Sequence, residues 1–456
     1  MTEGSRSRNP SPMALAPTQN ITHTAILRIA VPIVLSNMSE PLIGVVNTAV
    51  MGRLPGPHYI GGVAVGALIF AFLFWGFGFL RLSTGGLSAQ ATGADDKTEL
   101  VTVLFRSLIL ALAIGLCLVA LGPWLGPLAV SLVGGSDKVM AEAQVYFSYR
   151  IWAAPAALTN FAIMGWFIGQ GRSTTAFIVQ LFLNLTNMGL SAALVLGAGF
   201  ATAGVGIAVV TAEYAAMALG LALALRRLAA MKQVPDWAYI FRRDRFMALI
   251  TANGDIMIRT LCLVFAFGWF VSRGAKQGDL IVATNAVVLN LFEVSAYMID
   301  GFAYAAEALV GQAIGARARE RFRRAVGLTT LWAGVLGVLC ALVILVFGQP
   351  LAALMTVDPQ VRETASHYLG WAALATVAGT ACFQLDGIFT GAMATREMRN
   401  MMVLSLAVYM GAWWWLEPHY GNHGLWAALN IFFIARGITF MGRLGAIENR
   451  VFGGAS

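Results

Sequence analysis

The chain has 456 residues, of which 58% are hydrophobic and only 11% are Asp, Glu, Lys or Arg. A water-soluble domain carries about 25% charged residues, and a charge at the centre of a bilayer costs at least about 2.5 kcal/mol on insertion scales. The composition therefore excludes an ordinary soluble protein and predicts an all-α membrane protein whose partner is the lipid bilayer. The net charge of +8 does not indicate nucleic-acid binding, because the basic residues do not cluster on a soluble module.

Twelve apolar segments of about 20 residues each follow one another along the chain, with a polar interval after the sixth. They predict twelve transmembrane helices in two bundles of six. The segments of the first half lie near 26–50, 60–80, 102–129, 145–167, 175–198 and 203–225. Those of the second half lie near 248–271, 281–307, 326–347, 367–390, 400–416 and 424–445.

This pattern predicts five regions along the chain. They are a disordered cytoplasmic N-tail over 1–23, an N-lobe over 24–228, a cytoplasmic linker over 229–246, a C-lobe over 247–446 and a C-tail over 447–456.

Lys and Arg gather in alternate loops, and basic residues stay on the cytoplasmic side of a membrane. The side with few of them carries only Arg53, Lys138, Arg273, Lys276 and Arg362. We therefore expect a multi-pass protein of the inner (plasma) membrane, with both termini and the linker in the cytoplasm.

The two halves repeat short motifs at one spacing. The segment Gln90 to Ala94 (QATGA) and the segment Gln312 to Ala316 (QAIGA) begin 222 residues apart, since 312 − 90 = 222. Tyr146 and Tyr368 have the same offset, as do two G-x-F-x-G motifs that begin at Gly165 and Gly387. The agreement favours a duplicated six-helix unit, which in transporters lets two bundles rock about a central cavity.

Acidic residues inside the predicted spans are the most informative ones, because each is costly in lipid unless it pairs, titrates or lines a wet cavity. They are Glu40, Glu213, Asp255, Glu293, Asp300, Glu307 and Asp386. Glu293, Asp300 and Glu307 are spaced by seven, which places them near one stripe of the eighth helix. We expect that stripe to face a cavity, with Glu307 hydrated near the end of its span.

Two further acids belong to the second half. Asp255 and Arg259 are four residues apart on the seventh helix, which predicts an ion pair with either a structural or a coupling role. Asp386 has no base near it in the sequence, so we consider it the stronger candidate for ion coupling. Arg106 and Arg436 are interpreted as side chains that reach the membrane surface.

In the first helix, Glu40 directly precedes Pro41 and stands seven residues before Asn47 on roughly the same face. A lipid-facing carboxylate at this position is excluded by its cost. We expect Glu40 to face a cavity of the first half or to be protonated. The alternative is a structural hydrogen bond with a neighbouring helix.

Few residues could carry catalysis. The five histidines do not lie at metal-ligand spacing from a Cys or a carboxylate, and His419 and His423 lie in a segment interrupted by Pro418 and Gly421. No G-x-x-x-x-G-K-[ST] phosphate loop is present. We expect no catalytic residue, no metal site and no cofactor. An ion gradient is left as the energy source.

The chain also carries motifs of a known family. In the first half these are residues 41–54 (PLIGVVNTAVMGRL), 79–81 (FLR) and 84–91 (TGGLSAQA). In the second half they are Asn253, Asp255, Arg259, residues 300–308 (DGFAYAAEA), Asp386 with Gly387, and residues 397–400 (EMRN). Together they resemble the multidrug and toxic compound extrusion (MATE) exporters, specifically the DinF branch.

The resemblance implies two six-helix lobes around a central cavity, and export of amphiphilic, often cationic small molecules against inflow of H+ or Na+. We expect such a protein to act as a monomer. The candidate ion-coupling residues are Glu40, Asn47, Asp255, Asp300 and Asp386. The candidate substrate-cavity residues are Asn160, Asn187, Glu293 and Arg259.

One position departs from the family pattern. Where the DinF branch usually has an aspartate, in the pattern V-D-T-A-V, this sequence has Asn47, which cannot titrate. The family links that aspartate to proton coupling, so the choice between H+ and Na+ stays open.

Three alternatives remain at this point. One is a structural or sensor protein, which would transport nothing when purified and reconstituted. A flippase for lipid-linked precursors would need a cavity rich in Arg to bind pyrophosphate, whereas basic residues inside the predicted spans are few, mainly Arg150 and Arg259. A membrane enzyme acting on lipids would need a nucleophile and a base, and no such pair is evident.

The orientation predicts the labelling of single cysteines. Arg242→Cys and Arg319→Cys should react with a membrane-impermeant thiol reagent only from the cytoplasm, because their loops carry most of the basic residues. Lys138→Cys is the control and should react only from outside. Labelling of position 242 or 319 from outside would contradict the orientation.

Overall fold

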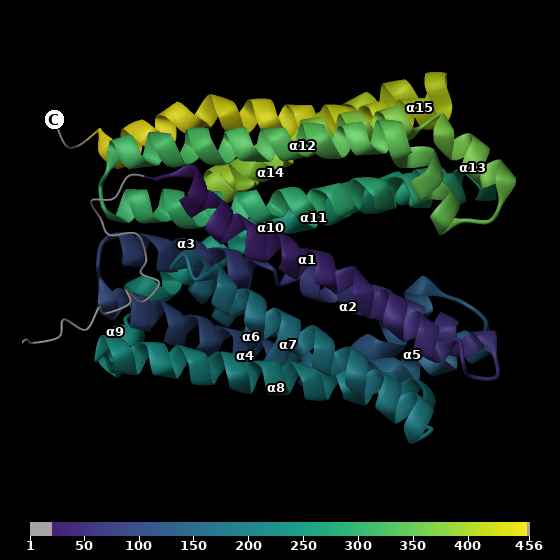
Figure 1. Ribbon diagram of the computed structural model, residues 1–456, viewed down its shortest axis with the longest axis horizontal. Helices are drawn as coiled ribbons and strands as arrows, with labels where there is room; N and C mark the ends of the chain where they lie inside the picture. The colour runs from purple at the N-terminus through teal and green to yellow at the C-terminus, as the bar shows by residue number, and fades with distance from the viewer. Residues whose placement is uncertain (1–20, 454–456) are drawn as a thin grey trace, which may run out of the picture.

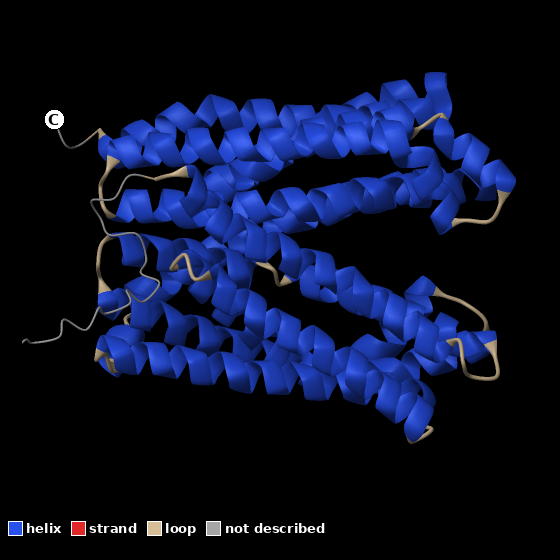
Figure 2. Ribbon diagram, viewed as in Figure 1, coloured by secondary structure: helices blue, strands red, loops and turns tan. Residues whose placement is uncertain are grey.

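The computed structural model describes residues 21–453, and these form helices with short connections and no strand (Figure 2). The first half contains α1 (His23–Met51), α2 (Pro57–Gly76), α3 (Phe79–Gly93), α4 (Lys97–Val133), α5 (Asp137–Arg150), a 3-10 turn (Ile151–Ala153), α6 (Ala154–Gly169), α7 (Ser173–Ala192), a π turn (Ala193–Gly197) and α8 (Ala201–Met231). The short α9 (Trp237–Ile240) follows. The second half contains α10 (Arg243–Ala275), α11 (Asp279–Gly315), α12 (Arg319–Met355), α13 (Pro359–Ser366), α14 (Leu369–Gly391) and α15 (Thr395–Phe452).

Within the described residues, eleven helical segments are long and apolar enough to cross a membrane. The last of them, α15, has 58 residues, or about 87 Å of helix, against a hydrocarbon core of about 30 Å. It consists of two helices joined at Gly421, whose φ of 55° and ψ of −130° lie outside the helical region. Divided there, the described residues contain the twelve membrane-crossing segments that the sequence predicts. The break also separates His419 from His423.

The helices form two groups that correspond to the two halves of the sequence (Figure 1). The helix α1 crosses between them. It begins beside α12, where the Arg324 Nε donates to the Ile21 carbonyl oxygen at 2.7 Å, and along its length it packs against α7 of the first half and α11 of the second. The predicted N-tail over 1–23 lies outside the described residues, apart from its last three.

The repeat predicted from the 222-residue offset recurs in backbone contacts. A Cβ atom on Gly165 would lie 2.3 Å from the Arg81 carbonyl oxygen, and one on Gly387 would lie 2.1 Å from that of Ala303, the equivalent position. Turns agree as well. Asp95 and Arg317, 222 residues apart, have positive φ of 52° and 51°. The twelve-helix fold with two pseudo-symmetric bundles is confirmed.

The QATGA and QAIGA segments lie at the ends of two helices. They form the last turns of α3 and α11 and bring the two halves together. The Gln90 Nε2 donates to the Gly391 carbonyl oxygen at 2.9 Å, and Gln312 donates to that of Gly169 at 2.9 Å. These two hydrogen bonds are equivalent in the repeat, and they join the lobes at the end of the bundle that also holds α9. We call this the linker end.

Close packing between α3 and α6 predicts a cost for a single added methyl group. Gly165→Ala should lower the free energy of unfolding by about 1–3 kcal/mol, because the new Cβ meets backbone atoms that cannot move aside. The measurement is the thermal unfolding midpoint in detergent. Gly189→Ala in α7 is the matched control, since nothing lies within 4 Å of its Cβ position. Equal midpoints for the two variants would contradict the tight contact.

Candidate functional site

A cluster of charges lies inside the second half, where three helices meet. The Asp386 carboxylate of α14 forms ion pairs with Arg259 of α10 and with Arg436 of α15, the latter at 2.6 Å. Arg436 is completely buried, with its guanidinium 5.5 Å from the ring centre of Phe432. The interpretation of Arg436 as a side chain that reaches the surface is wrong, because the guanidinium is buried and is paired with Asp386.

The predicted ion pair between Asp255 and Arg259 is also wrong. Asp255 instead accepts from Arg399 Nη1 at 2.6 Å and from Thr395 Oγ1 at 3.1 Å. Each member of the expected pair has a partner from another helix. The packing of α10 against α15, and of α15 against α14, decides this, because it offers the two side chains different neighbours. Asp386, which lacks a base in the sequence nearby, has two bases in space.

Asp300 of α11 lies within electrostatic range of this cluster, with Arg81, Arg259, Asp386 and Arg436 as charged neighbours. In the part of the chain that the structure describes, it forms no ion pair or hydrogen bond. Its stripe neighbour Glu293, two turns away along α11, is exposed. The third member, Glu307, is completely buried and pairs with Arg81 at 3.8 Å. The expectation of a hydrated Glu307 is therefore wrong.

Whereas the charge cluster lies in the second half, Asn47 lies in α1 of the first half. It lines a cavity of about 140 Å³ between α1 and α2. The lining residues are Gly44, Asn47, Thr48, Met51, Ile60, Val63, Ala64 and Ala67. This wall is apolar except for one hydroxyl and one amide. The side chain of Glu40 lies outside the described part of the structure.

The two asparagines predicted for the substrate cavity bind polar groups of the first half. The Asn160 Nδ2 donates to Glu213 Oε2 at 2.8 Å, and the Asn187 Oδ1 accepts from Ser191 at 3.1 Å. Asn160, Asn187, Glu293 and Arg259 were expected to line one cavity together. None of the four lines either of the two cavities described here.

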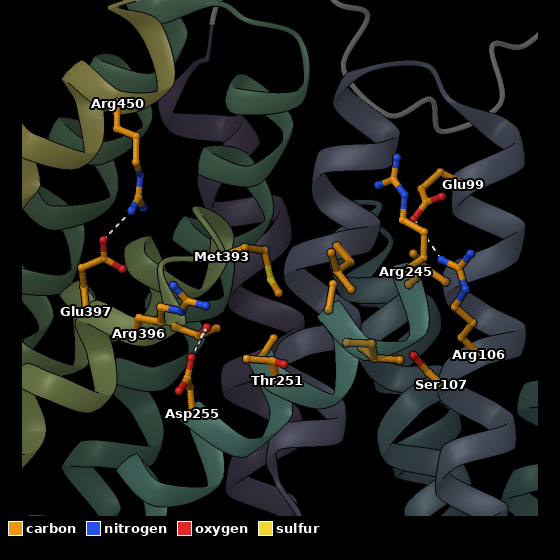
Figure 3. Close-up of a pocket in the computed structure, with 16 residues that line it drawn as sticks. Glu99, Arg106, Ser107, Arg245, Thr251, Asp255, Met393, Arg396, Glu397 and Arg450 are labelled. Carbon is orange, nitrogen blue, oxygen red and sulfur yellow. Dashed lines mark hydrogen bonds and ion pairs between the residues drawn. The ribbon is translucent and has the colours of Figure 1, made fainter. Parts of the chain in front are cut away.

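The second cavity, of about 440 Å³, lies at the linker end between the starts of α4, α10 and α15 (Figure 3). Its three acids are paired: Glu99 with Arg106 at 3.3 Å, Glu397 with Arg450 at 2.5 Å, and Asp255 with Arg399 at 2.6 Å. Arg106, which was expected to reach the membrane surface, reaches α9 at the linker end. It is 3% exposed and its guanidinium donates to the carbonyl oxygens of Tyr239 and Ile240 in α9.

Comparison with known proteins identifies the family. The MatE family model matches residues 32–193 and 256–412. The chain belongs to the MatE family. DNA damage-inducible protein F of Escherichia coli (strain K12) is 38% identical to it over 91% of this chain and 90% of that protein. The resemblance to the DinF branch is confirmed.

More distant relatives agree. Probable multidrug resistance protein NorM of Neisseria meningitidis serogroup B is 24% identical over 88% of this MatE chain and 89% of its own length. A solved structure described as the outward-facing conformation of a multidrug resistance MATE family transporter matches with a TM-score of 0.85 and 18% identity, over 97% of this chain and 100% of its own. At that identity the likeness shows the fold alone.

Membership of the MatE family makes the chain a multi-pass membrane transporter and excludes the alternative of a lipid-modifying enzyme. The basic residues that the flippase alternative requires are more numerous than the sequence indicated, since Arg81, Arg106 and Arg436 lie inside as well. Each of these, however, is bound to a carboxylate or to backbone carbonyls. They do not form an arginine-lined pocket for pyrophosphate.

The charge cluster of this MatE protein predicts a stability effect that can be tested. Asp386→Asn should lower the free energy of unfolding by about 3–5 kcal/mol, because two buried arginines lose their shared carboxylate. Asp386→Asn combined with Arg259→Gln should recover part of the loss, since one uncompensated charge is removed. The measurement is the thermal midpoint of each variant, with Glu293→Gln as the exposed control. A double variant no more stable than Asp386→Asn would contradict the coupling.

Proposed function

We propose that this MatE transporter is a secondary active antiporter that exports amphiphilic or cationic small molecules in exchange for H+ or Na+. The observation that carries the proposal is the state of Asp300. It is the acid of the second-half cluster that lies near three arginines and one aspartate without being bound to any of them. Asp386 is held by two arginines, so Asp300 is the group best able to take up and release a cation.

Charge balance supports this assignment. Arg81 is matched by Glu307, and Arg259 and Arg436 are matched by Asp386 and Asp300, so the cluster is neutral when all three acids are ionised. Binding of H+ or Na+ at Asp300 leaves one excess positive charge in a low-dielectric interior, which is costly. That cost gives the two conformations of a transporter different affinities for the ion, as coupling requires.

The proposed substrate class is supported by the cavity in the first half and by the names of relatives. The apolar cavity at Asn47 suits the hydrocarbon part of an amphiphile, although its 140 Å³ is below the about 300–1,000 Å³ of pockets for drug-sized ligands. A larger molecule would also need the space between the lobes. The NorM and MATE relatives carry multidrug resistance in their names. We place the protein in the inner membrane as a monomer with cytoplasmic termini.

The proposal predicts the behaviour of purified protein in proteoliposomes. Dye and bile-salt-like amphiphiles should move under an imposed proton or sodium gradient, and Asp300→Asn should reduce gradient-driven transport at least about tenfold, because the amide cannot exchange a proton or neutralise a cation. Separate H+ and Na+ gradients identify the ion. Glu293→Gln, on the same helix, should transport like wild type. Full transport by Asp300→Asn would remove Asp300 from the coupling site.

The first half offers a second coupling candidate, which the same assay can test. Glu40 lies about 10 Å along the helix from Asn47, beside Pro41. Within this proposal it replaces the aspartate that the DinF branch has at position 47. Glu40→Gln should then be inactive with a proton gradient, and the added change Asn47→Asp should restore transport. A fully active Glu40→Gln would rule out this role.

A further inference from the structure

Arg81 and Glu307 form a buried ion pair between the two lobes. Arg81 comes from α3 and Glu307 from α11, and the Arg81 Nη1 lies 3.8 Å from Glu307 Oε2. Glu307 is 0% exposed, and the guanidinium of Arg81 lies 3.9 Å from the ring centre of Tyr304, one turn before Glu307. Neither carboxylate oxygen of Glu307 has a hydrogen-bond donor among the described residues.

The carboxylate fits because the facing helix has a glycine. A Cβ atom on Gly85 of α3 would lie 1.8 Å from Glu307 Oε1. Gly85 and Glu307 are also equivalent in the repeat, since 307 − 85 = 222. The repeat thus places a glycine opposite the acid, and the Glu307 carboxylate fills the space left by the missing side chain. The flanking interlobe hydrogen bonds from Gln90 and Gln312 are neutral.

Among the charged groups on the helices packed against α11, Arg81 is the one that acts electrostatically on Glu307. Arg81 is the single charged residue of α3, α6 has none, and the one acid of α14, Asp386, is held by two arginines. The other described charged residues of the packed helices are His23 and Arg28 of α1, Arg243, Asp244, Arg245, Asp255, Arg259 and Arg273 of α10, Arg319, Glu320, Arg321, Arg323 and Arg324 of α12, and Arg362 and Glu363 of α13.

We propose that Arg81 and Glu307 form an ionic latch that holds the lobes together at the linker end, and that protonation of Glu307 releases it. When the lobes separate there, Arg81 leaves with one lobe and Glu307 with the other. An ionised pair resists separation, because each charge loses the partner that compensates its burial. A protonated Glu307 has no charge to lose. The free-energy cost of separating the lobes is then smaller by the interaction free energy of the ion pair.

This inference rests on the proposed antiport and deepens it. It assigns Glu307 as a positioning residue for the conformational step, distinct from the ion-binding Asp300. The reaction is a single proton transfer: one proton from the water at the linker end binds a Glu307 oxygen, and Arg81 keeps its own protons. By linkage, a proton that favours separation is itself bound more tightly in the separated state. Acid pH should therefore raise the fraction of molecules open at the linker end.

The test measures the distance between the lobes directly. Spin labels are attached at Lys97→Cys and Glu320→Cys, two exposed positions of opposite lobes near the linker end, after replacement of the four native cysteines. In lipid nanodiscs the wild-type distances should shift towards the separated population on acidification. Glu307→Gln should raise that population at neutral pH about fivefold or more, the lower range of typical coupling, and abolish the pH response.

Three further variants make the result specific. Arg81→Gln should also raise the separated population, and the double variant should add little beyond either single change, because both remove the same interaction. Gln90→Ala weakens a neutral interlobe hydrogen bond and should loosen the lobes while keeping the pH response. Glu448→Gln breaks ion pairs with Arg319 and Arg323 that lie within one lobe, and should leave the distances unchanged.

Wild-type distances and pH response in Glu307→Gln, with size-exclusion profiles showing folded protein, would overturn the latch. The same conclusion would follow if Glu448→Gln shifted the distances as much as Glu307→Gln. No substrate or ion gradient enters this measurement. A protein that exports none of the tested compounds would still show the latch, and failure of the antiport proposal is therefore separable from failure of this one.

Discussion

Compensation of buried charge is the constraint on which the rest of this structure depends. Hydrocarbon cannot solvate an ion, so an acid inside the bundle must pair with a base, accept hydrogen bonds or bind a cation. Asp386 joins α10, α14 and α15 in this way, Asp255 joins α10 to α15, and Glu307 joins the lobes. The same groups therefore stabilise the fold and carry its function, because a buried charge that needs a partner can exchange one partner for another.

Packing of small residues makes these pairings reachable. Close approach at glycines brings together the helices α3, α6, α11 and α14. The equivalent contacts at Gly165 and Gly387 show that both lobes have the same close helix packing. Side-chain hydrogen bonds then reach backbone carbonyls across the lobes, as at Gln90 and Gln312. Duplication thus supplies a symmetric frame. Function enters where the halves differ, at Glu307 opposite Gly85 and in the acids of the second half.

The sequence predicted the fold well and the site only in part. Apolar length and the repeat sufficed for twelve helices, because both are local or periodic signals. Partners were missed where they are distant in the chain: Arg259 was matched to Asp255, four residues away, and not to Asp386. Glu307 was placed at a span end, since the predicted span ends near 307, yet α11 continues to Gly315. Arg436, in the middle of a predicted span, was a signal of burial that could have been used.

The hydrogen bonds of Arg106 to α9 have a mechanical consequence. They attach the segment up to Ile240 to the start of α4, so that the free connection into α10 is reduced to Phe241 and Arg242. A chain of so few residues, at no more than about 3.6 Å each, extends by only about 10 Å. The lobes can rotate about this short connection, but the parts of the lobes next to it cannot move far apart. Any opening of the linker end must therefore be wedge-shaped, with its narrow edge at α9.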